Sequence, residues 1–575
     1  MLTCDLVLTD VRVVDVFRLR VYRGWVGIRK GIFLYVEEGS PPSGLTARET
    51  RGMEGLTILP GLIDSHMHIE SSLLTPRRFA EAVLPHGTTT VLADPHEVAN
   101  AGGEAGLRWF METSRNLPLD IRIALPSCVP ATSREVEWVR ESLDADTVRK
   151  FCSLPGVIAL GELMDYRRLL DERAKEEGTL WEMIQVAREQ GVQVEGHIPT
   201  LRGVELSEYI SSGIGSDHTL TNPEKLVEQL TKGLAVMLQE KSLTPEVIRA
   251  VGKLSDRSQV FLVTDDVEPS LLREGHLSLM VRKAVEGGMD PLEAIASATI
   301  RPARYLGLDR GIWKKGAIAP GYTADFLVVD GPVGFPPREV WVGGNRVAVK
   351  GRFLGSLEAS SPGEAKAQLP GPFTSKNFLF PPEICQFPYA QAIRVMDDRT
   401  SLTRLERVQV AFRDGFPLWE GEASECCAAS VISRNGEYRS FALICNLGLK
   451  AGGYASSFAH DSHNLLVVGR DPHSMARAAQ AVREGGGGIA VVKDTQEVIR
   501  LELPIFGILS DEPVDRVASK LEELERILRS LGIRRARPFL ILSLLSLSVS
   551  PYAKLTDRGI VDTEKRTILS PFSKE

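Results

Sequence analysis

Cysteine is scarce in this sequence: seven of the 575 residues are cysteines, and none lies in a C-x-x-C pair. The seven are scattered and odd in number: Cys4, Cys128, Cys152, Cys385, Cys426, Cys427 and Cys445. This distribution excludes the dense disulfide framework of a small secreted domain and the paired cysteines of a structural zinc site. We therefore expect free thiols and a reducing compartment, the cytoplasm.

Long apolar runs and an excess of either charge are also missing. The longest apolar stretch, residues 539–549, is too short and too rich in serine to span a bilayer. The first residues have neither the basic nor the apolar region of a signal peptide. Because Lys+Arg number 68 against 75 for Asp+Glu, with a net charge of −7, we expect no binding to nucleic acid or to an anionic membrane.

The pattern of strands and helices divides the chain into parts. Residues 1–55 and 309–355 hold short alternating runs, which predict one small β domain made from two separate segments. Between them, residues 56–308 alternate strand and helix, with helices at 76–84 and 180–190, which favours a parallel barrel or a doubly wound sheet. Residues 356–372 are rich in small residues and proline and predict a linker, and residues 373–575 form a further domain.

Two histidines, His66 and His68, stand at the end of an apolar run. Successive side chains of a β-strand point to opposite faces, so these two residues share one face and can bind one metal ion. Parallel α/β barrels place their chemistry at the carboxyl ends of the strands, and the pair lies at such an end. A single His-x-His pattern is common in proteins and has little weight by itself.

Further polar residues follow β-rich runs in the same way. Glu162 ends one run, His197 and His218 each follow another, and Asp265 with Asp266 ends a fourth. Imidazole and carboxylate groups are the ligands of hydrolytic zinc, manganese or iron sites. A structural histidine or a helix cap would explain any one of these residues, but it does not explain the series.

Several motifs together resemble those of one family. Pro60-Gly-Leu-Ile-Asp-Ser-His-Met-His and the later Pro320-Gly-Tyr-Thr-Ala-Asp-Phe are similar to the amidohydrolase superfamily. Within it, the chain resembles the bacterial adenine deaminases nearly end to end, through His68-Ile-Glu-Ser-Ser, Asp94-Pro-His-Glu-Val-Ala-Asn, Gly161-Glu-Leu-Met-Asp-Tyr, Thr264-Asp-Asp and Ala459-His-Asp-Ser-His-Asn. This resemblance implies an α/β fold: a (β/α)8 TIM-like metallo-hydrolase barrel, a small flanking β-sandwich domain and a C-terminal α+β adenine deaminase domain.

The resemblance also implies the ligands of a binuclear metal centre. His66, His68 and Asp265 would bind one metal, and Glu162 would bridge to a second that His197 and His218 complete. The family implies two Mn2+ ions per chain, with Fe2+ or Zn2+ as alternatives, and a homodimer or higher homo-oligomer. The implied reaction is the hydrolysis of adenine, a small-molecule substrate, to hypoxanthine and ammonia in purine salvage.

This reaction needs a base for the proton of the attacking hydroxide and an acid for the ring and the amino group. Asp265, with one oxygen on a metal, is the expected base. Glu70 and Glu97 are the candidates for the acid, because each follows a strand end within a histidine-containing motif. For either glutamate, the alternative is a carboxylate that the dipole of a helix start favours. Acid–base help of this kind supplies roughly 10²–10⁴-fold in rate.

Five further residues are candidates for substrate contact. His96 binds substrate or an additional metal, or is structural, and Asp266 orients a ligand or hydrogen-bonds the purine. His276 stands at a predicted helix start, where a cap, a supporting role or a substrate contact are alternatives. Asp461 and His463 of the last domain predict a polar cluster that reaches a site or serves the structure.

Some stretches depart from the family pattern. Thr219 and Gln239 stand where relatives commonly have glutamate and arginine, Asn435 replaces a histidine, and the stretch after His197 lacks the usual glycine-containing turn. None of these changes removes a predicted ligand, but each can alter the pocket. Two alternatives therefore stay open: a deaminase or cyclic amidohydrolase for another aminopurine or heterocycle, and a catalytically weak purine-binding paralogue. The intact Asp265 argues against the second.

Overall fold

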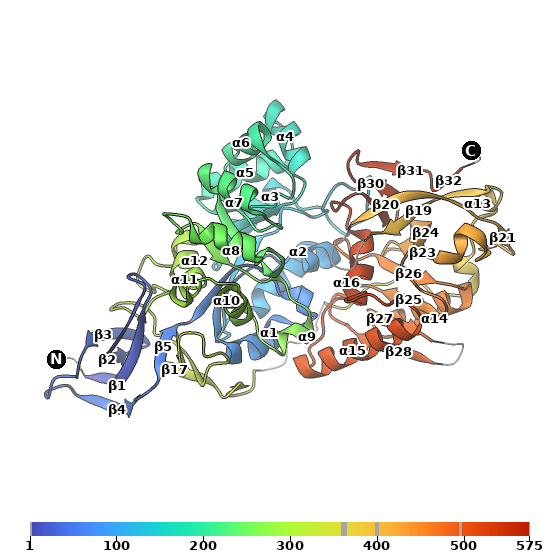
Figure 1. The fold of residues 1–575 in the computed structure, drawn as a ribbon. Helices are drawn as coiled ribbons and strands as arrows, with labels where there is room; N and C mark the ends of the chain where they lie inside the picture. The colour runs from blue at the N-terminus through green and yellow to red at the C-terminus, as the bar shows by residue number, and fades with distance from the viewer. Residues whose placement is uncertain (1–2, 358–364, 397–401, 494–496, 574–575) are drawn as a thin grey trace.

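The flanking β domain is one continuous sheet, built from the segment before the barrel and the segment after it. The computed structural model describes residues 3–357, 365–396, 402–493 and 497–573 (Figure 1). Nine strands form this sheet: β1 (Cys4–Asp15), β2 (Arg20–Arg29), β3 (Ile32–Glu38), β4 (Ala47–Gly52), β5 (Thr57–Pro60), β15 (Phe326–Val329), β16 (Glu339–Val342), β17 (Asn345–Val349) and β18 (Arg352–Phe353). Phe33 packs on Phe326 with ring centroids 5.9 Å apart. The two halves therefore face each other, and the expected sandwich is a single sheet folded over its own core.

The middle of the chain is a barrel of parallel strands. One sheet has the order β10-β9-β8-β7-β6-β14 and a second has the order β11-β12-β13. The bounds are β6 (Leu62–His68), β7 (Thr88–Ala93), β8 (Asp120–Leu125), β9 (Val157–Leu163), β10 (Gln193–Gly196), β11 (Ser216–Asp217), β12 (Ala235–Leu238), β13 (Val260–Leu262) and β14 (Asp265–Asp266). The Gly215 amide donates to the Val194 carbonyl at 2.9 Å between the two sheets. Because β14 pairs with β6, the last strand returns to the first.

Helices cover the outside of this barrel. They are α1 (Pro76–Val83), α2 (His96–Thr113), α3 (Ala145–Cys152), α4 (Tyr166–Lys175), α5 (Thr179–Gln190), α6 (Gly203–Ser211), α7 (Pro223–Thr231), α8 (Pro245–Gly252), α9 (Pro269–Leu272), α10 (Leu277–Glu286), α11 (Pro291–Ser297) and α12 (Ile300–Tyr305). Thr75 caps α1 by accepting a hydrogen bond from the Arg78 amide, and proline occupies the first turn. The helices predicted at 76–84 and 180–190 are confirmed as α1 and α5.

The C-terminal domain is a second nine-stranded sheet with helices packed against it. Its strands are β19 (Tyr389–Val395), β20 (Thr403–Gln409), β23 (Cys426–Ile432), β24 (Arg439–Cys445), β25 (Gly453–Ser456), β26 (Leu465–Gly469), β27 (Gly488–Val492), β28 (Val498–Glu502) and β32 (Phe572–Ser573). Its helices are α13 (Pro382–Cys385), α14 (Pro472–Glu484), α15 (Val514–Ser530) and α16 (Pro538–Ser543). Small sheets join β21 (Phe412–Arg413) to β22 (Phe416–Pro417), and β29 (Ala553–Thr556) to β30 (Gly559–Asp562) and β31 (Thr567–Leu569).

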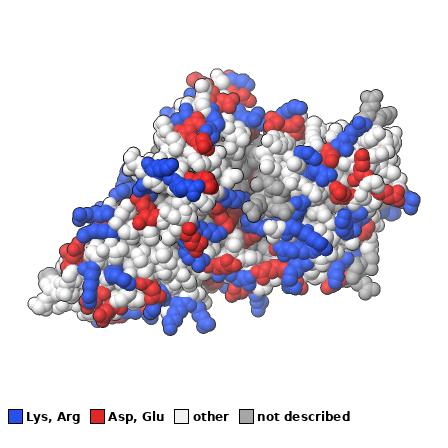
Figure 2. Space-filling view, viewed as in Figure 1, with Lys and Arg blue, Asp and Glu red and all other residues white. Residues whose placement is uncertain are grey.

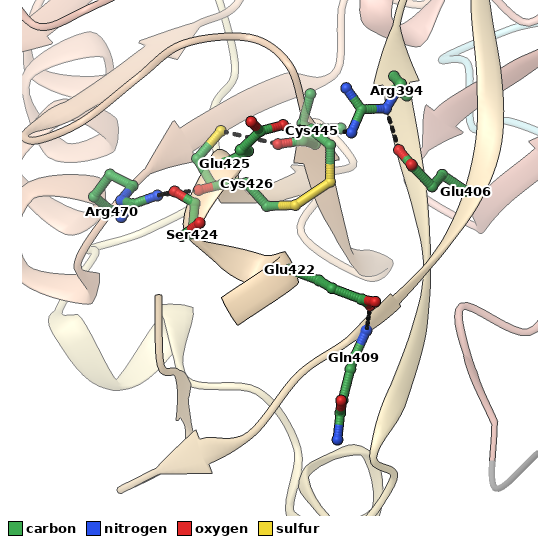
Figure 3. Close-up of a disulfide and its surroundings, with 11 residues drawn as sticks. Arg394, Glu406, Gln409, Glu422, Ser424, Glu425, Cys426, Cys445 and Arg470 are labelled. Carbon is green, nitrogen blue, oxygen red and sulfur yellow. Dashed lines mark hydrogen bonds and ion pairs between the residues drawn. A yellow bond between two sulfur atoms is a disulfide. The ribbon is translucent and has the colours of Figure 1, made fainter. Parts of the chain in front are cut away.

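The structure corrects the prediction that all cysteines are free thiols. Cys426 and Cys445 form a disulfide that links β23 to β24 (Figure 3). The two residues stand directly opposite each other in the antiparallel pair. Strand register brought them together, and the 19-residue separation in sequence gave no sign of it. The remaining cysteines are free thiols.

The C-terminal domain packs directly on the barrel. The Ser510 amide donates to the Leu73 carbonyl at 2.8 Å, and the Thr75 amide donates to the Ser510 carbonyl at 3.1 Å. Arg537 pairs with Glu268 at 2.9 Å. Of the predicted linker, residues 358–364 lie outside the described residues, and the Ala365 carbonyl accepts from the Phe506 amide at 2.6 Å. Figure 1 places α16 between the barrel and the rest of the domain.

Two further features of the fold are the character of its helices and the distribution of charge on its surface. Among the residues that the structure describes, no helix combines the length and the apolar character needed to cross a membrane. On the face in Figure 2, lysine and arginine side chains are intermixed with aspartate and glutamate.

Candidate active site

Six residues predicted from strand ends lie together at the carboxyl end of the barrel. His66 and His68 belong to β6, Glu162 to β9, and Asp265 opens β14. His197 and His218 directly follow β10 and β11. Parallel strands present their carboxyl ends on one face, so six residues from five strands converge there. All except His197 and Asp265, which are half-buried, are buried.

Glu162 lies at the centre of this group. Its Oε2 is 2.6 Å from His197 Nδ1 and 3.2 Å from His218 Nε2. Its Oε1 is 3.3 Å from His68 Nε2. The two oxygens of one carboxylate therefore face two separate groups of histidines.

Asp265 lies on the His68 side of the group. Its Oδ1 is 3.5 Å from His68 Nε2 and 3.9 Å from His66 Nε2. Its Oδ2 accepts a hydrogen bond from Gln239 Nε2 at 2.7 Å. The backbone of Asp265 has a φ of 58°, in the left-handed region that non-glycine residues rarely occupy. One oxygen thus faces the histidines and the other is held by an amide.

The donor atoms of this group fit a divalent metal. His66 Nε2 and His218 Nδ1 are buried without a hydrogen-bond partner, and uncompensated burial of a polar atom is costly. Three sets have their donor atoms within 4.8 Å of one another: His66, Glu162 and His218; His66, His68 and Asp265; and His68, His96 and Glu162. Imidazole with carboxylate is a donor set suited to zinc, manganese and iron.

Asp94 orients two members of the group. Its backbone carbonyl lies 3.0 Å from His68 Nδ1, which leaves Nε2 of that ring directed to the site. Its Oδ2 accepts from the Glu162 amide at 3.0 Å. A Cβ at position 161 would stand 2.1 Å from that oxygen, so Gly161 is the residue that lets the aspartate approach.

Glu70 and Glu97, the two candidates for the acid, lie beside each other close to this group. Glu70 Oε1 accepts from the Val98 amide at 3.2 Å, and its Oε2 is buried without a partner. Burial, reinforced by the nearby charge of Glu97, raises the pKa of Glu70 to about 8. Ser71 Oγ donates to Glu97 Oε1 at 3.3 Å and also to Asp266. Glu97 is therefore linked to Asp266 through one hydroxyl.

The C-terminal domain reaches this site through the loop that carries Asp461 and His463. His460 Nδ1 is 3.3 Å from Glu97 Oε1, and Asp461 Oδ1 is 3.9 Å from His96 Nε2. His463 Nε2 is 3.9 Å from Glu97 Oε2. Although burial opposes it, the carboxylates of Glu97 and Asp461 raise the pKa of His460 to about 9. The predicted polar cluster is thus in contact with the barrel.

Arg434 holds that loop in place. Its guanidinium donates to the His463 carbonyl at 2.7 Å, to the Phe506 carbonyl at 2.7 Å and to the Ser457 carbonyl at 3.2 Å. Burial lowers the pKa of Arg434 to about 9. The planar guanidinium holds its N–H donors in a rigid arrangement, which allows it to bind these three carbonyls at once.

His276 and His96 occupy different surroundings. His276 precedes α10 and is buried, with Nδ1 2.9 Å from Thr88 Oγ1 and Nε2 3.3 Å from Thr264 Oγ1. Both of its ring nitrogens thus have protein partners, and burial lowers its pKa to about 3. His96 begins α2, and its Nδ1 is 3.7 Å from Asp94 Oδ1 and 3.9 Å from Glu162 Oε1.

A cavity of about 170 Å³ opens beside the group, with Asp265, Asp266 and Gln239 in its wall. Sequence reasoning did not single out Asp94, Ser71 or His460, although all three stand within or beside the motifs that were recognised. Their roles depend on contacts across the fold.

Comparison with known proteins is consistent with this geometry. The model of the amidohydrolase family matches residues 57–353, and that of the adenine deaminase C-terminal domain matches residues 400–567. A protein of Clostridium perfringens named adenine deaminase is 34% identical, with 99% of each chain covered. A protein of Carboxydothermus hydrogenoformans named adenine deaminase 2 is 37% identical over 98% of this chain and 96% of its own. A third, from Methanothermobacter thermautotrophicus, is 37% identical over 88% and 91%.

This chain belongs to the adenine deaminase family of amidohydrolases. A parallel barrel with a folded flanking sheet and a C-terminal domain is accordingly an amidohydrolase-type fold, and the family implies a divalent metal.

The departures from the pattern of adenine deaminases lie in different places. Thr219 Oγ1 donates to the Ile198 carbonyl at 2.9 Å and accepts from Lys225 at 2.6 Å, so its side chain is engaged away from the cavity. Asn435 Oδ1 accepts from Ser433 and from the Glu437 amide, within a turn. Of these three departures, Gln239 is the one that contacts a predicted ligand, Asp265.

Proposed function

We propose that this protein hydrolyses adenine to hypoxanthine and ammonia in purine salvage. Relatives named adenine deaminase that match nearly the whole chain support this activity. The observation that carries the proposal is the position of Asp265, whose Oδ1 faces His66 and His68 while the residue also lines the cavity. No observation favours another aminopurine, a cyclic amide or a purine-binding paralogue.

We propose two Mn2+ ions per chain. His66, His68 and Asp265 would hold one, Glu162 would bridge, and His197 with His218 would hold the second, while Fe2+ or Zn2+ suit the same donors. When bound, such a pair acts as a Lewis acid and lowers the pKa of water from about 16 to about 7.

Asp265 is the proposed base. Since Gln239 holds its Oδ2, the carboxylate keeps a fixed orientation toward both the ligands and the cavity. It accepts the proton that the attacking water loses at C6. A base in hydrogen-bond reach of the reacting water is the first requirement for such a transfer.

Glu97 is the proposed acid, and it shares a proton with the neighbouring carboxyl group of Glu70. Ser71 connects Glu97 to Asp266, which lines the cavity. Asp266 is proposed to hydrogen-bond the purine. A proton on Glu97 moves to Ser71 Oγ as the hydroxyl proton of Ser71 moves to Asp266, and Asp266 passes that proton to the ring. Because burial raises the pKa of Glu70, this pair keeps a proton near neutral pH.

The C-terminal loop is proposed to complete the site. The loop covers Glu97 and His96 with the side chains of His460, Asp461 and His463 and excludes water from the carboxyl groups of Glu70 and Glu97. His96 would position Glu162, and His276 would support the wall through Thr264. We also propose, from the family resemblance, a cytoplasmic protein that forms a homodimer or a higher homo-oligomer.

The test is the release of ammonia and hypoxanthine from adenine by protein stripped of metal and reloaded with manganese. We expect manganese-dependent turnover that Asp265→Asn abolishes. An inactive wild type with two metals bound per chain would refute adenine as the substrate. Metal content that peaks at one ion per chain in the most active preparation would refute the binuclear centre.

A further inference from the structure

The C-terminal segment of residues 538–549 contains two sets of leucines with different surroundings. It consists of α16 and the short 3-10 helix η6 (Leu544–Ser546), followed by Leu547 and a turn. Leu542 and Leu545 are 0% and 2% exposed and belong to the main hydrophobic core. Leu540, Leu544 and Leu547 are half-buried and line the cavity beside Asp265. The same residue type thus serves two purposes in one segment.

The spacing of the second set explains its direction. Leu540 in α16 and Leu544 at the start of η6 stand at i and i+4, which places them on one side of the helical segment, and Leu547 directly follows η6 and lines the same cavity. That side of the segment is turned to the barrel, because the cavity's other wall comes from β14, α10 and the stretch after β12. Figure 1 shows α16 at this boundary between the two parts of the chain.

The cavity is lined by polar and by apolar groups. The barrel supplies the polar groups of Gln239, Asp265 and Asp266 and the apolar side chains Leu271, Leu279 and Met280. The C-terminal domain supplies the three leucines and, with Arg537, a charged group. Apolar side chains left uncovered inside a cavity favour an apolar surface as their partner. A planar heterocycle suits both kinds of lining, since its face is apolar and its edge carries hydrogen-bonding atoms.

The size of the cavity is consistent with such an occupant. Its volume is about 170 Å³, whereas an apolar cavity of roughly 150 Å³ holds benzene. Pockets for drug-sized ligands span roughly 300–1,000 Å³. The space therefore suits a small ring system.

We propose that Leu540, Leu544 and Leu547 form a wall, contributed by the C-terminal domain, that binds the face of the substrate ring and selects planar heterocycles. This inference rests on the proposed function in one respect: it takes Asp265 as the reacting end of the cavity. The ring lies between this leucine wall and the aspartates. The C-terminal domain thereby contributes directly to substrate binding as well as to closure of the site.

The experiment compares Leu544→Ala and Leu547→Ala with Leu545→Ala in the full-length, manganese-loaded protein. Leu545 is the matched control, because it is the neighbouring leucine but its side chain packs in the core. We expect the two wall variants to raise KM for adenine on the order of tenfold with kcat nearly unchanged. The control should lower thermal stability and leave KM unchanged, and Leu545→Val replaces it where the alanine variant does not fold.

A second readout does not need turnover. Calorimetric titration of adenine into the metal-free wild type and variants measures binding alone, and we expect about tenfold weaker binding in the wall variants. An inactive wild type would refute the proposed function, and the titration would then still decide the wall. The inference would be overturned if the wall variants had the same KM and the same adenine affinity as the wild type. It would also be overturned if Leu545→Ala weakened adenine binding as much as the wall variants do, or if no protein bound adenine.

Discussion

The side-chain amide of Gln239 donates one hydrogen bond to Asp265 Oδ2 at 2.7 Å and another to the His218 carbonyl at 3.2 Å. One side chain thus connects the strand end that carries the proposed base to the strand end that carries a proposed ligand. Gln239 lies on the stretch after β12, outside the predicted ligand set. The neutral amide fixes the orientation of the carboxylate and adds no charge to it.

Replacing Gln239 by leucine should therefore lower kcat more than it raises KM. Without the donor, Asp265 Oδ2 loses its partner and the carboxylate becomes free to rotate. We expect a loss in kcat on the order of 10-fold to 100-fold, since misplaced catalytic groups are costly. Steady-state kinetics together with metal analysis checks this. A variant that retains full kcat, or that loses activity only in proportion to lost metal, would contradict a positioning role.

Replacement of Glu97 by glutamine should reduce kcat more than replacement of Glu70. We expect roughly 10²–10⁴-fold for Glu97→Gln if it supplies the proton, because Ser71 links Glu97 to Asp266. Ser71→Ala interrupts the same path, so it should produce a partial loss. Pre-steady-state rates of ammonia release give the comparison. Equal effects of the two glutamine variants would instead assign the proton to the pair as a unit.

Glu137 should make the stability of the protein depend on pH. The carboxylate is buried between Thr132 Oγ1 at 2.9 Å and Ser548 Oγ at 2.7 Å, where barrel and C-terminal domain meet. Burial raises the pKa of Glu137 from 4.5 to about 7. The folded state therefore binds more protons than the unfolded state between these pH values, so stability falls as pH rises through this window. The loss amounts to about 3 kcal/mol.

Glu137→Gln isolates this effect from other buried carboxyls. We expect the variant to match the wild type near pH 5 and to unfold at a higher temperature near pH 8. Thermal unfolding at both pH values provides the measurement. Melting temperatures that stay parallel across the pH range would show that Glu137 titrates as an exposed glutamate does.

Loss of the Cys426–Cys445 disulfide should destabilise the C-terminal domain. The bond closes a loop with a sequence separation of 19, for which chain entropy gives about 3 kcal/mol. The double variant Cys426→Ala, Cys445→Ala should unfold at a lower temperature and keep its turnover number at 25 °C. Cys385→Ala, which removes a free and half-buried thiol, is the matched control. If the wild type is unfolded without a reducing agent and all seven of its cysteines are then alkylated, the disulfide is absent.

The sequence by itself determined the local features of this protein. His66 and His68 alternate on one strand, so their shared face follows from the pleat alone. Glu162 and Asp265 follow apolar runs, and the alternation of strands and helices favoured a parallel barrel or a doubly wound sheet, in which the carboxyl ends of the strands lie at one edge. The family motifs extended this reasoning to the fold and to the family, which the comparisons confirmed. The ligand roles of the individual residues remain proposals.

Only the tertiary structure decided which distant segments meet and which way their side chains point. Thr219 and Gln239 were equal departures in the sequence, yet one bonds Lys225 away from the cavity and the other holds Asp265. The contacts of His460 with Glu97 join residues more than 360 positions apart. Contacts of this kind depend on how whole domains pack, and no local pattern of residues encodes them.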